Sequence, residues 1–206
     1  NPLIVSPSST TTYTITGANG SCTGTQTLTI PVNSVCPCPA LTGLLPPVIT
    51  TTLISNGSFA VNQNVTINGN VLFANVELLV SPNVSITVTG SSTLTINRSH
   101  IYACGDMWQG IKVDPNAKLL IFSDVLIEDA VSAIIANNPS GSGNILDIED
   151  CVFNRCFTGI TIKNYNFANP TYPFKIRRCI FTNRQLPFTS TLPISSSLWP
   201  NYSSLI

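Results

Sequence analysis

One short pattern recurs five times in this sequence, at intervals of 23 to 28 residues, and it constrains the fold more than any other feature. Its first, third and eighth positions are apolar, and its sixth is small or apolar. The five copies are residues 71–78, 94–101, 120–127, 146–153 and 174–181. One copy cannot bury its apolar side alone, so the copies must stack on one another. We therefore predict an all-β fold, a right-handed parallel β-helix of about five or six coils over residues 55–185.

The residue types agree with this prediction. Thr, Val and Ile favour strands, and no window has a helical 3.6-residue period. A second short strand is expected between copies, at 108–113, 131–136 and 157–162. Charged residues make up only 9% of the chain. That scarcity excludes a basic surface for nucleic acid, and no apolar run is long enough to span a membrane.

The first third of the chain has a different organisation. Residues 10–16 and 25–32 alternate as strands around a turn at 17–21, which predicts a hairpin. Because an isolated hairpin is marginally stable, we interpret residues 1–35 as the last strands of a sandwich domain. Residues 36–54 are predicted to be a Pro-rich linker, and residues 186–206 a tail that packs on the β-helix or leads to a further domain.

Two segments resemble known families. The run Ser6-Pro-Ser-Ser-Thr-Thr-Thr-Tyr-Thr-Ile-Thr16, followed by Gly20-Ser-Cys22, resembles the end of the immunoglobulin-like or PKD-like repeats of large Bacteroidetes surface proteins. The repeat, together with Cys104-Gly-Asp-Met-Trp-Gln-Gly-Ile-Lys-Val113, resembles the pectin-lyase-like β-helix domains of secreted Bacteroidetes proteins. The resemblance implies an extracellular or cell-surface location and export by the type IX route.

The seven cysteines are compatible with an oxidising compartment. Cys22 is predicted to bridge to Cys36 or Cys38. Cys151 and Cys179 occupy the same repeat position, where a disulfide and two free, stacked thiols are both conceivable.

The register predicts how the few charges are used. Residues at equivalent positions of successive coils lie above one another, which places opposite charges side by side. Five such pairs are expected: Asp147–Lys175, Glu149–Arg177, Asp150–Arg178, Arg98–Asp124 and Asp129–Arg155. Their role would be to fix the register between coils.

Few residues remain for catalysis. Asp106, Asp114 and Lys163 are the catalytic candidates, and Trp108 is a candidate for stacking on a sugar. Trp108 has an alternative interpretation as a packed residue above Val131 and Phe157. The only histidine, His100, is interpreted as an outward strand residue, and we expect no metal site and no cofactor.

The seventh repeat position becomes apolar in the later copies, at Leu126, Val152 and Ile180. Because this position points outward, it forms an apolar strip that needs a cover. The chain's own tail, at 186–194 and 198–202, is the first candidate, and a partner protein is the second.

Together these features favour a non-catalytic extracellular module, such as an adhesin, stalk or filament segment of a larger secreted protein. Its partners would be other protein chains or further domains of the same chain, without nucleic acid or membrane insertion. The alternative is a polysaccharide lyase, a glycoside hydrolase or a carbohydrate-binding β-helix, because this fold carries such functions elsewhere.

Overall fold

The computed structural model describes residues 11–30, 39, 41, 43–137, 145–164 and 174–183. These residues form strands, turns and bends and no helix. The chain divides into two compact units, Asn1–Pro39 and Ala40–Ile206. Each unit is described by itself below.

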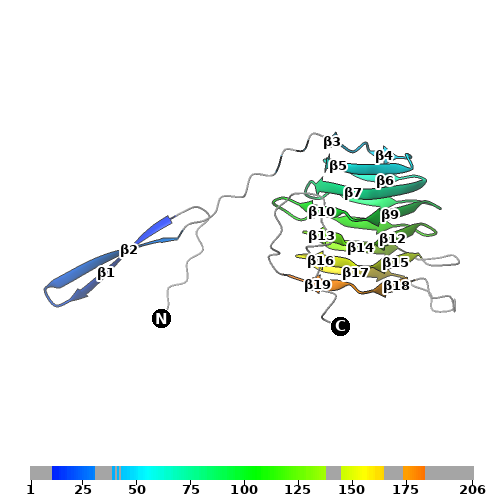
Figure 1. Cartoon of the computed structure of the whole chain (residues 1–206). Coiled ribbons are helices and arrows are strands. Elements are labelled where there is room, and N and C mark those ends of the chain that lie inside the picture. The colour runs from blue at the N-terminus through cyan, green and yellow to red at the C-terminus, as the bar shows by residue number, and fades with distance from the viewer. Residues whose placement is uncertain are drawn as a thin grey trace. The chain divides into compact units, whose positions relative to one another are not determined.

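The first unit contains the predicted hairpin. Strands β1 (Thr11–Asn19) and β2 (Cys22–Ile30) pair antiparallel and form a two-stranded sheet (Figure 1). The strands run closer to the turn than expected, because Asn19 pairs with Cys22 and only Gly20 and Ser21 lie between them. Gly20 has a φ of +62°, a backbone conformation that glycine adopts without strain.

The second unit is a parallel β-solenoid, as the repeat predicted. All strand pairs in its two sheets are parallel (Figure 1). The six-stranded sheet contains β4 (Val48–Ile49), β6 (Val65–Ile67), β8 (Ser85–Val88), β11 (Gly110–Val113), β14 (Ser132–Asn137) and β17 (Thr158–Lys163). The eleven-stranded sheet contains β3 (Gly43–Leu44), β5 (Leu53–Val61), β7 (Asn70–Val80), β9 (Thr93–Asn97), β10 (His100–Ala103), β12 (Lys118–Phe122), β13 (Val125–Glu128), β15 (Leu146–Glu149), β16 (Cys151–Asn154), β18 (Phe174–Arg177) and β19 (Ile180–Thr182).

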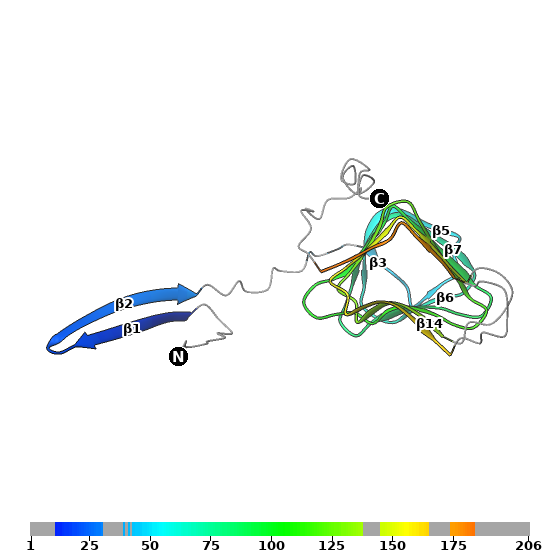
Figure 2. The same ribbon diagram turned by 90° about the horizontal axis from the view of Figure 1, so that it is seen from below.

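The eleven-stranded sheet folds over a corner, so the solenoid has three sides (Figure 2). The first half of β7 pairs with β9 and its second half pairs with β10. Between the halves lies Asn75, whose φ is +56°. A residue with a positive φ, between 44° and 62°, occupies this corner in each described coil. These residues are Asn56, Asn75, Arg98, Asp124, Asp150 and Arg178. At the top of this ladder, the Asn75 side-chain amide donates a 2.8 Å hydrogen bond to Asn56 Oδ1.

The core is built from the inward positions of the repeat. Leu94, Ile96, Leu146 and Ile148 are fully buried. The copy at 120–127 differs by one residue, because Leu119 and Ile121 point inward while Leu120 and Phe122 are partly exposed. The repeat pattern predicts that the first and third positions of this copy, Leu120 and Phe122, point into the core, and for this copy the prediction was wrong.

The extra residue that causes this shift is Ser123. The pairing restores the expected register after it, since His100 lies opposite Leu126. Ser123 and Asp124 both have positive φ, at 58° and 62°. This left-handed turn absorbs one residue, as a β-bulge does.

The solenoid also begins earlier than expected. Strands β3 and β4 lie within the segment that was predicted to be linker, and they pair with β5 and β6. Leu45 and Ile49 are 2% and 1% exposed, so they belong to the core. Pro46 and Pro47 lie between the two strands, where the absence of a backbone N–H does not break a ladder.

Candidate functional site

A cluster of polar and ionisable side chains extends over the outward sides of β5, β7, β10, β13 and β16. We call the outward face of β7, β10, β13 and β16 the β10 face. The cluster links neighbouring coils through side-chain hydrogen bonds. Its members, which we call the outer cluster, are Ser58, Glu77, His100, Tyr102, Glu128, Asn154 and Arg155.

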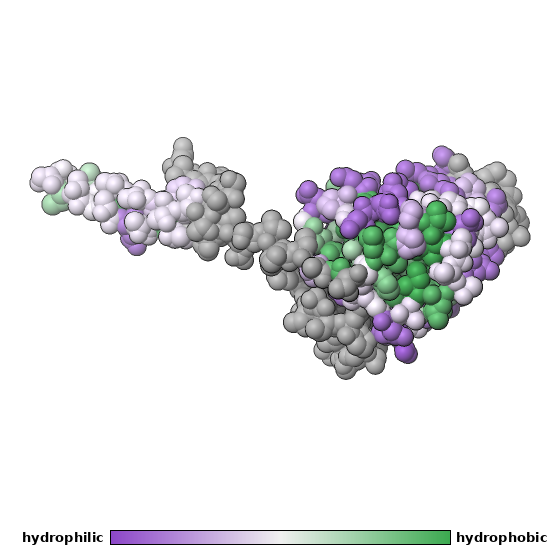
Figure 3. All heavy atoms as spheres, turned by 90° about the horizontal axis from the view of Figure 1, so that it is seen from above, coloured by the Kyte–Doolittle hydropathy of each residue, from purple (hydrophilic) through white to green (hydrophobic). Residues whose placement is uncertain are grey.

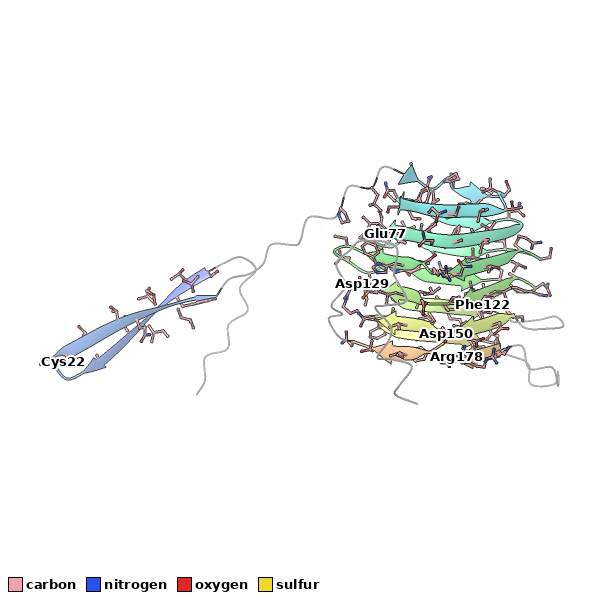
Figure 4. The ribbon with its side chains drawn as sticks, in the orientation of Figure 1. Cys22, Glu77, Phe122, Asp129, Asp150 and Arg178 are labelled. Atoms are coloured by element: carbon pink, nitrogen blue, oxygen red, sulfur yellow. The ribbon has the colours of Figure 1, made fainter. Side chains whose placement is uncertain are left out.

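At one end of the outer cluster, Glu77 accepts two hydrogen bonds. The Tyr102 hydroxyl donates to Oε1 at 2.8 Å, and the Ser58 hydroxyl donates to Oε2 at 2.8 Å. Burial, reinforced by the Glu77 carboxylate, raises the pKa of Tyr102 well above its usual value. Tyr102 is therefore a neutral hydrogen-bond donor over the physiological range. Figure 4 shows Glu77 on the upper part of the solenoid.

At the other end, Glu128 is held by three side chains. His100 Nε2 donates to Oε2 at 2.7 Å, Asn154 Nδ2 donates to Oε1 at 2.6 Å, and Arg155 Nη1 lies 3.1 Å from Oε1. Burial alone would raise the pKa of Glu128. The contact with His100, followed by the hydrogen bond from Asn154 and the positive charge of Arg155, outweighs that effect and lowers the pKa.

A stacked aromatic pair connects the two carboxylates. The rings of His100 and Tyr102 lie 4.4 Å apart with an angle of 18° between their planes. Both residues belong to β10, and each bonds to a carboxylate on a different neighbouring strand. Two acids, a histidine and a tyrosine on one face are a familiar set for acid–base chemistry.

The two carboxylates of the outer cluster are closed to solvent, although Arg155 at its edge is partly exposed. Glu77 and Glu128 are each 5% exposed, and Asn154 is fully buried. Both oxygens of each carboxylate already accept a hydrogen bond. In this state the arrangement cross-links coils and has no free carboxylate oxygen for a substrate.

The predicted catalytic residues do not converge. Asp106 lies in the loop before β11 and Asp114 lies directly after β11, at the opposite end of that strand. Lys163 ends β17, which is two strands away from β11, a distance of about 10 Å at the usual strand spacing. The structure does not bring the three side chains into one groove.

Trp108 is not a sugar platform. It is fully buried, and its Nε1 donates a 2.8 Å hydrogen bond to the backbone carbonyl of Glu128. The alternative interpretation of Trp108 as a packed residue is therefore confirmed, but its backbone pairs with Ala130, so the neighbours predicted for it, Val131 and Phe157, are wrong. Those two side chains are exposed, at 38% and 83%.

The predicted charge pairs are confirmed at four of the five places. Asp147–Lys175 spans 3.5 Å, Asp150–Arg178 2.7 Å and Asp129–Arg155 2.7 Å, and Glu149 pairs with Arg177. Arg178 also reaches Glu149. Asp150 and Arg178 lie on the lower coils in Figure 4. The fifth expected pair is Arg98–Asp124. Burial and the charge of Asp150 raise the pKa of Asp124, while the charge of Arg98 acts in the opposite direction.

The five cysteines that the structure describes divide into two groups. Cys104 is disulfide-bonded, while Cys22, Cys151, Cys156 and Cys179 are free thiols. The predicted partners of Cys22, at positions 36 and 38, lie outside the described residues. Of the two states expected for Cys151 and Cys179, the structure has the free one and not the disulfide. Burial raises the pKa of Cys156 to about 11, which leaves its thiol protonated and unreactive.

Two residues of the predicted interface strip, Leu126 and Val152, lie on the β10 face, and the third, Ile180, lies on the neighbouring strand β19. Leu126 and Val152 are 1% and 3% exposed within the single chain, and Ile180 is half-buried. Leu126 and Val152 are therefore not available as a free surface for another protein.

Other sites are scarce among the described residues. No group of three or more His, Cys, Asp or Glu residues in that part of the chain could hold a metal ion. A pocket on the outward side of β7 and β9 is lined only by uncharged residues, which are Thr52, Asn70, Val71, Leu72, Thr93 and Thr95. Within the described ranges, no helix is long and apolar enough to cross a membrane.

Sequence reasoning missed the outer cluster. Glu77 and His100 share one repeat position, and Tyr102 lies two residues after His100, on the same side of the strand. The alternation therefore contained a signal for the shared face. The contacts themselves run diagonally between coils, and a comparison of equivalent positions does not reveal them.

No family model, curated protein or solved structure matches this chain.

Proposed function

We propose that this chain is a non-catalytic extracellular module, a rigid β-solenoid that serves adhesion or assembly within a larger secreted protein. The observation that carries the proposal is the use of its charges. Most carboxylates of the solenoid bond to a side chain of a neighbouring coil, so they stabilise the stacking of coils. A catalytic groove needs carboxylates that are free to meet a substrate.

Two further observations support the location and the assembly role. The disulfide at Cys104 fits an oxidising, extracellular compartment. The last coil exposes inward-pointing apolar residues, since Ile162, Ile176 and Phe181 are 39%, 42% and 55% exposed. At the other end, Leu44 is 59% exposed, and Figure 3 shows apolar atoms gathered there. Such apolar ends fit contacts with other chains or further domains.

The finer identity is part of the same proposal. We assign the hairpin to the end of an immunoglobulin-like or PKD-like repeat and the solenoid to a right-handed, pectin-lyase-like β-helix of five or six coils. Type IX export in a Bacteroidetes organism follows from the same resemblance.

A second candidate is a polysaccharide lyase or glycoside hydrolase that uses the outer cluster. The observation that favours it is the pair of carboxylates, Glu77 and Glu128, linked by His100 and Tyr102 on one outward face. Their 5% exposure argues against it.

Turnover assays separate the two functions. The chain is incubated with acidic and neutral polysaccharides, and unsaturated uronates and new reducing ends are measured. The proposal expects none above background. Turnover that disappears in Glu128→Gln but persists in the matched control Glu149→Gln, which lies outside the outer cluster, would overturn it in favour of the enzyme.

A further inference from the structure

We infer that the β10 face is a docking surface whose occupant is the C-terminal segment 186–202 of the same chain. The inference goes beyond the proposed function and agrees with it, because a segment over the β10 face would also shield the outer cluster from a substrate. It starts from the direction of two side chains. Leu126 lies between Val125 and Ile127, which belong to the inner core, and therefore points outward. Val152 lies opposite Leu126 on the next strand and points the same way.

Outward residues elsewhere on the solenoid provide an internal comparison. Ile135 on β14, and Leu120 and Phe122 on β12, are apolar, outward and only partly buried. Leu126 and Val152 are 1% and 3% exposed, although they do not belong to the inner core cluster. Strand neighbours alone leave an outward side chain partly exposed, so a covering layer lies over the β10 face.

Polar residues of the β10 face are also more buried than the outward residues used for comparison on β12 and β14. Tyr102 is 9% exposed and Glu128 is 5% exposed, and Asn154 is fully buried. These residues extend over β10, β13 and β16, which are consecutive strands of the sheet. The cover therefore spans about 10 Å across the strands, at the usual spacing.

The cover belongs to this chain, because the burial arises without a second chain. The described strands and turns form the walls and corners of the solenoid, and β19 brings the chain to the edge of this same face, with Ile180 opposite Val152. The 17 residues of 186–202 reach about 55 Å when extended, which is ample. The segment carries no charge, and its apolar residues suit an apolar strip: Leu186, Phe188, Leu192, Ile194, Leu198 and Trp199.

Hydrogen–deuterium exchange of the full chain tests the inference. We expect the amides of 186–202 to exchange about tenfold or more slowly than in a free peptide. Val152→Lys, which places a charge under the cover, should remove that protection. The control Thr66→Lys adds the same charge to the outward side of β6, away from the β10 face, and should leave the protection unchanged.

A variant of the segment covers the case in which Val152→Lys fails to fold. Trp199→Ser should release 186–202 while the amides of β7 and β9 stay protected. Exchange of 186–202 at free-peptide rates in the unmodified chain would overturn the inference, and so would protection that survives both Val152→Lys and Trp199→Ser. Protection that vanishes on dilution would overturn it in favour of a second copy. These experiments measure amide exchange and not polysaccharide turnover, so the inference and the proposed function are judged by separate measurements.

Discussion

His100 Nε2 lies 2.7 Å from Glu128 Oε2, although the pairing of β10 with β13 places Leu126 opposite the histidine. The contact is diagonal, two residues along the neighbouring strand, which long side chains can reach. Tyr102 makes the corresponding diagonal to Glu77 on the other side of β10. One strand therefore ties together the coils before and after it.

The first prediction concerns acid stability. The folded state lowers the pKa of Glu128 below its ordinary 4.5. This stabilisation is present above pH 4.5 and is lost as the pH falls through the lower, folded value. We expect the melting temperature of the chain to fall in that window. Glu128→Gln should lower the free energy of unfolding by about 1–3 kcal/mol at neutral pH, because it weakens the bonds to His100 and Arg155. The melting temperature of this variant should also fall less steeply as the pH is lowered.

Glu149→Gln is the matched control for this prediction. Burial alone would raise the pKa of Glu149, but Arg177 and Arg178 together outweigh it and lower the pKa. Both arginine side chains are exposed. Added salt should therefore weaken the effect of Glu149 and leave that of Glu128 nearly intact. If the melting temperature fell equally steeply at acidic pH in Glu128→Gln and in the unmodified chain, the prediction would be contradicted.

The second prediction concerns alkaline stability. The pKa of Tyr102 is raised above its ordinary 10.0 by burial and by Glu77. A raised pKa stabilises the fold fully below pH 10.0, and this contribution declines as the pH rises beyond it. Tyr102→Phe should reduce the decrease in the free energy of unfolding above pH 10.0. At neutral pH it should lower that free energy by about 1 kcal/mol only, since Glu77 keeps the hydrogen bond from Ser58.

Urea unfolding at pH 8 and above pH 10 measures this difference. Tyr13→Phe in the hairpin is the control, because Tyr13 lies in the other compact unit. Equal alkaline losses in Tyr102→Phe and in the unmodified chain would show that the hydroxyl does not titrate with unfolding.

The repeat correctly predicted the solenoid and four of the five expected charge pairs, because stacking brings equivalent positions of successive coils together. The prediction of core residues failed in the coil that has one more residue at the corner than its neighbours. Ser123 adds one residue at a corner, and nothing in its residue type distinguishes it from the serines of ordinary turns. The outer cluster was not predicted for a different reason. The contact of His100 with Glu128 depends on side-chain length and direction more than on the register of the strands.

The third prediction concerns Gly110. Its φ is +97°, and a Cβ at this position would lie 1.6 Å from the carbonyl oxygen of Ser132 on β14. The obstacle is backbone, so β11 and β14 would have to separate. Gly110→Ala should destabilise the chain by about 3 kcal/mol or more, measured by urea unfolding.

Gly90 separates the steric effect from the conformational one. Its φ is +58°, but a Cβ there has no atom within 4 Å. Gly90→Ala should therefore cost only about 1 kcal/mol, from the left-handed backbone alone. Similar losses for the two variants would mean that β14 does not approach β11 as closely as the structure has it.

The fourth prediction tests whether Trp108 is structural. Its indole is fully buried, and Nε1 bonds to the carbonyl of Glu128, the residue at the centre of the outer cluster. Trp108→Phe leaves that carbonyl unpaired and opens a cavity, so we expect a loss of about 2–4 kcal/mol in chemical unfolding. Phe157→Ala is the control, because Phe157 is 83% exposed and its removal should change stability by less than about 0.5 kcal/mol. If Trp108→Phe left stability unchanged but weakened binding to a polysaccharide, the indole would have to face solvent, and the packing described for it would be wrong.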